Sequence, residues 1–339
     1  MVSISTINNA RILLTGITGY IGSQIIKDLI NWKIINNLNI SFVAITRDVE
    51  KAKKVYEGND ITYICTDICN DKQMQAQMYI MQEKGIDYII HCAAPTKSSF
   101  MIANPIETVD SISIGTKNIL EIARRLKVKS MVYLSSMEVY GNLKCVDENG
   151  DYTRITEEQL GDLDITKIRS CYPLGKRMAE YYCYAYYSEH GVPVKVARLA
   201  QTFGKGVQPD DNRVYAQFAH SVIENKSIIL HTDGSSIGNY VDIEDAVDAI
   251  LTILFKGENG EAYNVVNESN TMSIREMAEL VAYEIGEGKI KVCYDIPQTD
   301  LYGYAAPTGL RLSSEKLQRL GWEPKYNLFD MYKKMIDSI

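Results

Sequence analysis

The sequence of 339 residues lacks the features that mark membrane and secreted proteins. It contains no uninterrupted apolar run of about 18 residues, the length that a membrane-spanning helix needs. Residues 1–10 lack the basic and apolar blocks of a secretory signal peptide. We therefore expect no membrane partner and a cytoplasmic location.

Positive charge is also scarce. The chain has 36 lysine and arginine residues against 43 acidic ones, a formal net charge of -7. A protein with this balance does not attract nucleic acid or anionic membranes non-specifically. We expect no nucleic-acid partner, and any phosphate group must be bound by a local site.

Paired cysteines are missing as well. The seven cysteines are an odd number and are scattered along the chain, so they do not form a disulfide framework. Cys65 and Cys69 are four residues apart, but no CxxC pair or histidine cluster accompanies them. We expect reduced, buried thiols and no metal site.

What is present is typical of a globular protein, with 46% hydrophobic and 23% charged residues. The first half alternates β-rich runs with helical patterns such as residues 21–30 and 114–126. Repeated strand and helix units predict a parallel sheet covered on both faces, a doubly wound Rossmann-type α/β fold. The expected strands span residues 11–15, 40–46, 61–65, 88–92, 131–135 and 193–198.

The alternation weakens from about residue 201. A stretch rich in glycine, proline and aspartate (204–212) precedes helical patterns at 214–224, 243–255 and 273–285. We predict an NAD(P)-binding Rossmann domain over residues 1–200. Residues 201–339 form a mainly substrate-binding region in this interpretation, with some elements returning to the Rossmann domain.

A glycine-rich loop follows the first expected strand directly and precedes a helix. Gly16 would allow the tight turn, Gly19 the close approach of a pyrophosphate, and Gly22 the packing of helix on strand. An ordinary turn is the alternative, but the strand before and the helix after favour dinucleotide binding. The predicted contacts of this loop are Gly16, Thr18, Gly19, Tyr20, Ile21 and Gly22.

Cofactor choice depends on the end of the second strand. Arg47 could bind the 2′-phosphate of NADP, and Asp48 could cap the helix that begins near Val49. Arg47 as an ordinary surface charge is an equal alternative. We therefore predict NAD or NADP, with a slight preference for NADP. Asp67, after the third strand, could meet the adenine amine or cap a turn.

Tyr172 and Lys176 lie one helical turn apart on one face of a predicted helix. An ammonium near a phenol should lower the phenol pKa from about 10 toward working pH. Ser136, at the end of the fifth strand, could donate a hydrogen bond to a reacting oxygen. The alternatives are an exposed helix face and a serine in a turn.

Together these motifs resemble the extended short-chain dehydrogenase/reductase family, also called the NAD-dependent epimerase/dehydratase family. The resemblance covers nearly the whole chain and includes a closing segment at 311–322. It rests on the loop at 15–22, Asp67 and Ile68, Cys92, Ala93 and Ala94, Gly115 and Thr116, Ser136, residues 139–141, Tyr172 and Lys176.

The resemblance implies an enzyme that holds NAD(P) and transiently oxidises a nucleotide-linked sugar, often at C4. Ser136, Tyr172 and Lys176 match the family's catalytic triad, and Glu138 matches a carboxylate of sugar dehydratases and decarboxylases. It also implies cofactor contacts at Ile68, Cys92, Ala93, Ala94, Tyr172 and Lys176. A homodimer is implied too, with residues 105–124 as a candidate interface helix.

Three positions depart from the family pattern. Ile112 replaces an asparagine, Gln201 replaces an asparagine that commonly meets the nucleotide sugar, and Gly238 replaces an arginine that often grips the diphosphate. We expect Arg213 or Arg311 to supply the missing positive charge. Gln201, Arg213 and Arg311 are thus the predicted substrate contacts.

Three functions remain open on the sequence. The first is an epimerase- or decarboxylase-like enzyme acting on a nucleotide-activated sugar. The others are an NADPH-dependent reductase of a nucleotide-linked keto-sugar or ketose, and a non-enzymatic NADP(H)-sensing protein. An efficient 4,6-dehydratase is not expected, because such enzymes carry two adjacent carboxylates where this chain has Met137 and Glu138.

Overall fold

The computed structural model describes residues 7–143, 145, 153–297 and 309–339. Residues 1–6, part of the segment in which the sequence predicts no signal peptide, lie outside these ranges. Within the ranges, none of the helices combines the length and apolar character that crossing a membrane requires.

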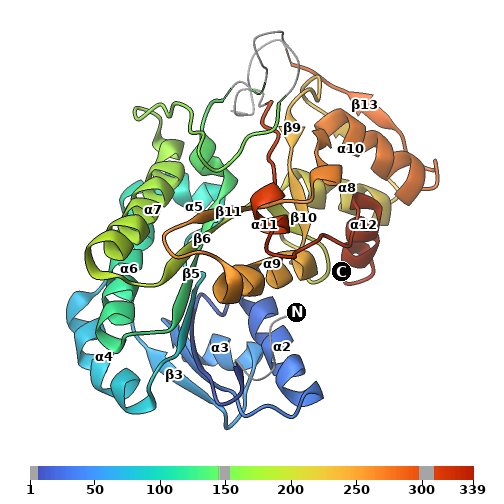
Figure 1. The fold of residues 1–339 in the computed structure, drawn as a ribbon. Helices are drawn as coiled ribbons and strands as arrows, with labels where there is room; N and C mark the ends of the chain where they lie inside the picture. The colour runs from blue at the N-terminus through green and yellow to red at the C-terminus, as the bar shows by residue number, and fades with distance from the viewer. Residues whose placement is uncertain (1–6, 144, 146–152, 298–308) are drawn as a thin grey trace.

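A seven-stranded parallel sheet lies at the centre of the molecule (Figure 1). Its order is β11-β6-β5-β4-β1-β2-β3, so the direction of winding reverses between β1 and β4. This is the Rossmann-type topology, and the expected fold class is confirmed. The strands are β1 (Arg11–Thr15), β2 (Ser41–Thr46), β3 (Ile61–Cys65), β4 (Tyr88–His91), β5 (Ser130–Ser136), β6 (Val194–Leu199) and β11 (Ala262–Val265).

Neighbouring residues of a strand face two different helical layers. Ile12 and Leu14 of β1 join one buried apolar cluster, whereas Leu13 joins the other. Strands of a parallel sheet are apolar on both faces because helices cover both. One layer holds α2 (Tyr20–Ile35), α3 (Val49–Val55) and α9 (Ile243–Lys256); the other holds α4 (Asp71–Lys84), α6 (Pro105–Leu126) and α7 (Cys171–His190) (Figure 1).

A third buried cluster lies in the second half of the chain, among α8 (Val214–Ile223), α10 (Ile274–Leu280) and α12 (Leu328–Ile336). The helices predicted from residues 214 and 243 are confirmed to within one residue at each end. The pattern at 273–285 forms α10 and then a π-helical turn, η4 (Val281–Ile285). Three two-stranded sheets complete this part: β7 (Gln201–Phe203) with β10 (Tyr240–Asp242), β9 (Ile237–Gly238) with β12 (Met272–Ser273), and β8 (Ile228–Leu230) with β13 (Val292–Tyr294).

Two elements from the second half lie against the central sheet. β11 pairs with β6, and α9 packs on β5 and β6. The division at residue 200 itself stays a prediction. The remaining short elements are α5 (Ser98–Ala103), η1 (Met137–Tyr140), η2 (Ile168–Ser170), η3 (Glu268–Asn270) and α11 (Glu315–Gln318).

Candidate active site

The carboxyl ends of β1, β4 and β5 lie next to one another because these strands are neighbours in a parallel sheet. Each of these ends leads into a segment that the sequence singles out: the glycine loop, residues 92–94 and Ser136. In open α/β sheets, ligands bind where the strand order reverses, here between β1 and β4. The predicted site therefore forms one region of the fold.

The glycine loop joins β1 to α2 with very little space. Gly16 has a φ of +73°, and a Cβ there would lie 2.8 Å from the backbone nitrogen of Ala93. A Cβ on Gly22 would overlap the carbonyl of Gly16. Gly19 is the N-cap of α2, with no side-chain cap and no acidic residue in the first turn. The free N–H groups of this helix end suit an anion such as a pyrophosphate.

Other residues of the loop differ in their surroundings. Ile21 packs on the first buried cluster, and Thr18 is half-buried. Tyr20 points toward the second half of the chain, where its hydroxyl donates a hydrogen bond of 3.1 Å to the carbonyl of Lys205. Burial is the main cause that raises the Tyr20 pKa. The loop is thus tied to the region expected to bind substrate.

A hollow of about 300 Å³ opens beside the ends of β2 and β3. Its lining includes Arg47 and Asp67, the two residues predicted to face the adenosine half of the cofactor. Arg47 is 72% exposed and lies 3.7 Å from the carboxylate of Glu107. Asp67 accepts a hydrogen bond from the backbone of Cys69, and the predicted helix cap at Asp48 is confirmed. The lining residues are Arg47, Cys65, Thr66, Asp67 and Gln73.

Ile68, Cys92, Ala93 and Ala94 complete the predicted cofactor contacts. Ile68 is buried, and a Cβ on Gly115 of α6 would lie only 2.7 Å from its Cδ1. Residues 92–94 are half-buried at the end of β4, and the nitrogen of Ala93 donates to Thr15 Oγ1 at 3.2 Å.

His91, just before these residues, was missed by sequence reasoning although it adjoins a recognised motif. It is fully buried and bridges two hydroxyls, Thr15 Oγ1 at 2.6 Å and Thr116 Oγ1 at 3.1 Å. Burial, aided by the charge of Lys176, lowers the His91 pKa to about 3. A neutral imidazole therefore connects the base of the glycine loop to α6.

Ser136 and Tyr172 meet at the mouth of the sheet. Ser136 ends β5 and caps η1, its hydroxyl accepting from the backbone of Glu138 at 3.2 Å. Tyr172, in the first turn of α7, is only 8% exposed. Burial is the main cause that raises its pKa, and Glu138 adds to the rise, whereas a hydrogen bond with Ser136 opposes it. The two predicted side chains are brought together.

Lys176 is also buried, but it does not act on Tyr172 as the sequence predicts. Its Nζ donates to the carbonyl of Leu134 at 2.7 Å and lies 5.7 Å from the centroid of the Tyr172 ring. Burial lowers the Lys176 pKa to about 8. The expected lowering of the Tyr172 pKa by this lysine is wrong here, because burial disfavours the charged form of both groups.

Glu138 pairs with Arg169, a residue that sequence reasoning did not single out. Arg169 Nη2 lies 2.9 Å from Glu138 Oε1, and Arg169 Nε donates to Ser98 Oγ at 3.1 Å. The guanidinium carbon lies 5.3 Å from the ring centroid of Tyr172. Its position three residues before Tyr172 was the available signal, because Arg169 lies in η2, the turn that leads directly into α7.

Two of the three family departures, Ile112 and Gly238, have packing explanations. Ile112 of α6 is buried, and its side chain occupies the space beside Gly175 of α7, between the two helices. At Gly238 a Cβ would overlap the phenol of Tyr240. An arginine side chain could therefore not be added at Gly238 without moving Tyr240.

The predicted substrate residues lie in three different places. Gln201 begins β7 and pairs in register with Tyr240. Arg213 forms an ion pair with Asp211, and its positive charge is among the influences that lower the Tyr172 pKa. Arg311 accepts a backbone hydrogen bond from the nitrogen of Ile155. Of the two arginines, Arg213 is the one whose charge acts on Tyr172.

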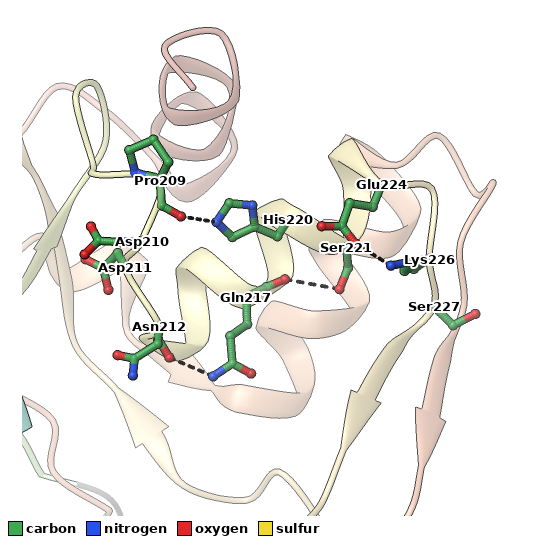
Figure 2. Close-up of a pocket in the computed structure, with 10 residues that line it drawn as sticks. All are labelled: Pro209, Asp210, Asp211, Asn212, Gln217, His220, Ser221, Glu224, Lys226 and Ser227. Atoms are coloured by element: carbon green, nitrogen blue, oxygen red, sulfur yellow. Dashed lines mark hydrogen bonds and ion pairs between the residues drawn. The ribbon is translucent and has the colours of Figure 1, made fainter. Parts of the chain in front are cut away.

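A second, larger hollow of about 520 Å³ follows the outer side of α8. Figure 2 shows polar side chains around it, with His220 bonded to the carbonyl of Pro209 and Gln217 bonded to that of Asn212. None of the predicted catalytic or cofactor residues is among those lining it. Asp211 links it to the site, because this lining residue is the partner of Arg213.

Metal-binding side chains do not gather in the part of the chain that the structure describes. There, no group of three or more histidine, cysteine, aspartate or glutamate residues could hold a metal ion. The seven cysteines, all within the described ranges, are free thiols, but Cys65 and Cys293 are exposed, so the expected burial is wrong for these two.

Known proteins are similar to this chain in sequence over most of its length. UDP-glucuronic acid decarboxylase 6 of Arabidopsis thaliana is 27% identical over 326 residues, covering 95% of this chain and 86% of the relative. Human dTDP-D-glucose 4,6-dehydratase is 25% identical over 338 residues, covering 96% and 89%.

Solved structures share the fold. UDP-glucose 4-epimerase from Thermotoga maritima superposes with a TM-score of 0.78 at 22% identity, over 97% of this chain and 98% of that one. The family described as the NAD dependent epimerase/dehydratase family matches residues 12–267, which include the glycine loop, Ser136, Tyr172 and Lys176. The chain belongs to the NAD dependent epimerase/dehydratase family of enzymes.

Proposed function

We propose that this enzyme remodels a nucleotide-activated sugar through a transient keto intermediate, with NAD or NADP as its hydride carrier. The observation that carries the proposal is the meeting of Ser136 and buried Tyr172 at the carboxyl end of β5, on the same edge of the sheet as the glycine loop. The names of the relatives, a UDP-glucuronic acid decarboxylase and a dTDP-D-glucose 4,6-dehydratase, support a nucleotide sugar as the substrate class.

The residues present fit a dinucleotide. Gly16 and Gly22 keep the loop tight, and the uncapped N-terminus of α2 offers N–H groups to a pyrophosphate. The hollow beside Arg47 and Asp67 suits the adenosine half. The bound cofactor supplies the acceptor for a hydride from the sugar carbon.

The catalytic side chains divide the proton work. Tyr172, as phenolate, accepts the proton of the sugar hydroxyl that is oxidised, and Ser136 donates a hydrogen bond to the same oxygen. Lys176 lies near the Tyr172 ring, and its hydrogen bond to the carbonyl of Leu134 connects α7 to the end of β5. Glu138 is the carboxylate available for a second proton transfer.

Substrate contacts belong to the second half of the chain in this proposal. The positive charge of Arg213 is among the influences that lower the pKa of the catalytic tyrosine. We assign it to the anionic part of the substrate, with Gln201 near the end of β6 as a polar contact. The charge of Arg311 acts on Glu276, whose pKa is lowered chiefly by hydrogen bonds from Ser273, so we assign the anionic part of the substrate to Arg213 rather than to Arg311.

The reaction type is epimerase- or decarboxylase-like. A 4,6-dehydratase needs an acid beside Glu138 for the departing hydroxyl, and Met137 has no proton to give. Losing that acid forfeits a factor of about 10² to 10⁴ in rate. A second candidate, an NADPH-dependent reductase of a keto-sugar, is favoured only by the position of Arg47 at the cofactor hollow.

One experiment tests the proposal and separates its branches. The purified enzyme is incubated with UDP-, dTDP-, CDP- and GDP-sugars and with each oxidised and reduced cofactor, and products are weighed by mass spectrometry. We expect a mass-neutral product or loss of carbon dioxide. A gain of two hydrogens would assign the reductase, and rapid loss of water would contradict the exclusion of a dehydratase.

The control is Tyr172→Phe, which removes the phenol but leaves the glycine loop unchanged. Turnover should fall by a factor of about 10² to 10⁴ while cofactor stays bound. Near-normal turnover in this variant would remove Tyr172 from the catalytic assignment.

A further inference from the structure

Arg169 makes three contacts that join separate parts of the site. Its Nη2 bonds Glu138 of η1 at 2.9 Å, and its Nε bonds Ser98 of α5 at 3.1 Å. Its guanidinium carbon lies 5.3 Å from the ring centroid of Tyr172. One cation therefore spans the carboxylate, a neighbouring helix and the aromatic ring of the proposed base.

Arginine suits this position better than lysine. A guanidinium is planar and permanently charged, so it can bond two acceptors in its plane while its face lies over an aromatic ring. Arg169 Nη1 is buried and has no hydrogen-bond acceptor among the described residues. The Arg169 side chain is 35% exposed, and its guanidinium places a positive charge over the Tyr172 ring.

We propose that Arg169 is a positioning residue for proton transfer, which holds Glu138 beside Tyr172 and compensates its negative charge at the phenol. The inference rests on the proposed function, because it assigns Arg169 a part in the proton step of that reaction. Without Arg169, an uncompensated carboxylate would stand next to a group that must itself become negative.

The charges around the phenol support this assignment. Burial first and Glu138 second raise the Tyr172 pKa, whereas Ser136, Arg169 and Arg213 lower it. The ammonium group of Lys176 donates its hydrogen bond to the backbone carbonyl of Leu134. The ionisable groups that face Tyr172 from the packed elements are Tyr133 of β5, Glu138 of η1, Arg169 of η2, Lys176 of α7 and Arg213 before α8.

The proposal predicts the direction in which each substitution moves the pH profile. Oxidation requires the phenolate, so activity rises with pH through the pKa of Tyr172. Removing the positive charge in Arg169→Gln should move this acid limb to higher pH by about one unit or more. Removing the negative charge in Glu138→Gln should move it to lower pH, and the double variant should lie near the wild type.

The first experiment is the pH profile of kcat at saturating substrate and cofactor for these three variants. Arg169→Lys keeps the charge and should keep the acid limb near its wild-type position even if kcat falls. Arg319→Gln is the matched control, because Arg319 also pairs with a glutamate, Glu315, but lies on the surface. An Arg169→Gln profile that falls in height without moving would overturn the proposal.

A second experiment needs no turnover. A ring-difluorinated tyrosine, whose phenol is more acidic, is incorporated at position 172 and titrated by fluorine NMR in the full-length protein. Arg169→Gln should raise the fluorophenol pKa by about one unit, and Arg319→Gln should leave it unchanged. Equal fluorophenol pKa values in the Arg169→Gln and Arg319→Gln proteins would overturn the inference.

The two measurements separate this inference from the proposed function. A shifted NMR titration in an enzyme that turns over no nucleotide sugar would leave the role of Arg169 intact and contradict the function. Turnover of a nucleotide sugar with an unmoved titration would contradict the role of Arg169 alone.

Discussion

At the scale of single residues, burial controls the proton affinity of the catalytic groups. Burial raises the pKa of Tyr172, and it lowers the pKa of Lys176 to about 8 and that of His91 to about 3. All three shifts favour the neutral form, as a dry environment requires. Arg169 and Arg213 are among the groups that lower the Tyr172 pKa, and an arginine keeps its charge when it is partly buried.

Cofactor preference is a residue-scale prediction. If Arg47 binds a 2′-phosphate, Arg47→Ala should weaken NADPH binding by about 1.5 to 3 kcal/mol, the range of a charged hydrogen bond, and should spare NADH. Calorimetric titration of both cofactors measures this. Glu107→Gln is a useful comparison, because it removes the neighbouring carboxylate 3.7 Å from Arg47. Equal loss for NADPH and NADH in Arg47→Ala would make Arg47 an ordinary surface charge.

His91 should make folding sensitive to acid. Its pKa is about 3 in the folded protein against an ordinary value of 6.5, so the unfolded chain binds more protons between these values. The contribution of His91 to the free energy of unfolding is then fully present above pH 6.5 and is lost as the pH falls toward 3. The slope from this group approaches about 1.4 kcal/mol per pH unit.

Urea unfolding of the wild type and of His91→Gln between pH 7 and pH 5 tests this slope. A single titrating group can change the free energy of unfolding by at most about 1.4 kcal/mol per pH unit. The comparison matters because Asp242, whose pKa is raised to about 6 by burial, contributes with the opposite sign. We expect a shallower loss of stability with acid in the variant. Parallel pH curves would show that His91 does not titrate as described.

At the scale of elements, the turn from β1 into α2 depends on glycine for two separate reasons. Gly16 combines a left-handed φ of +73° with close contact to residues 92 and 93. Gly191, after α7, has a similar φ of +67° but nothing near its missing Cβ. A substitution at Gly191 therefore tests the cost of the backbone conformation alone, whereas one at Gly16 adds the steric overlap of a Cβ.

We expect Gly191→Ala to lower the free energy of unfolding by about 1 to 2 kcal/mol, the cost of the left-handed conformation, and to leave cofactor binding unchanged. Gly16→Ala should lower stability further and also weaken cofactor binding by about tenfold or more, equivalent to about 1.4 kcal/mol. Denaturant titration and cofactor titration measure the two effects. Normal cofactor affinity in Gly16→Ala would contradict the assignment of this loop.

Packing between elements also explains the departure from the family pattern at Ile112. Ile112 and Gly175 let α6 and α7 approach beside the catalytic residues. Trp322 in the closing segment is buried and donates to the carbonyl of Asp245 on α9 at 3.1 Å. The end of the chain is thereby held against the helix that covers the central sheet.

At the scale of the whole molecule, a buried polar network joins the two halves of the chain. Arg198 of β6 pairs with Glu180 of α7 at 2.8 Å and donates to the hydroxyl of Tyr140 at 3.0 Å. Tyr140 in turn donates to Asn264 of β11 at 2.7 Å. Since buried polar groups need partners, this network aligns η1, α7 and β11 around the site.

The assembly state is the last prediction. α6 and α7 lie side by side at the edge of the molecule (Figure 1), and their outer face exposes large apolar side chains. We expect a homodimer through this face, which would bury about 800 Å² on each partner. The exposed residues are Ile106, Ile114, Met178, Tyr181 and Tyr184.

Sedimentation velocity checks the dimer. The wild type should sediment at twice the mass of one chain, and Ile106→Glu combined with Tyr181→Glu should give a folded monomer. Tyr283→Glu, which changes a tyrosine on η4 that is even more exposed than Tyr181 and lies outside this face, should remain a dimer. A monomeric wild type would contradict the prediction.

The sequence by itself determined the features that depend on local order. Apolar runs predicted six strands of the central sheet to within one residue at each end, and the fold class with them, but the seventh strand, β11, was not predicted. Helical spacing predicted α8 and α9 to within one residue at each end. The glycine loop and the spacing of Tyr172 and Lys176 were visible for the same reason. Each reflects neighbours in the chain, which a sequence displays directly.

Tertiary structure alone decided how these groups behave. The rise of the Tyr172 pKa comes from burial by elements distant in sequence, and Lys176 bonds a carbonyl 42 positions away. Arg169 and Glu138, 31 residues apart, meet only because η1 and η2 converge at the end of β5. His91 links β1 to α6 in the same way. Desolvation and charge pairing depend on distances through space, and those are set when the layers pack.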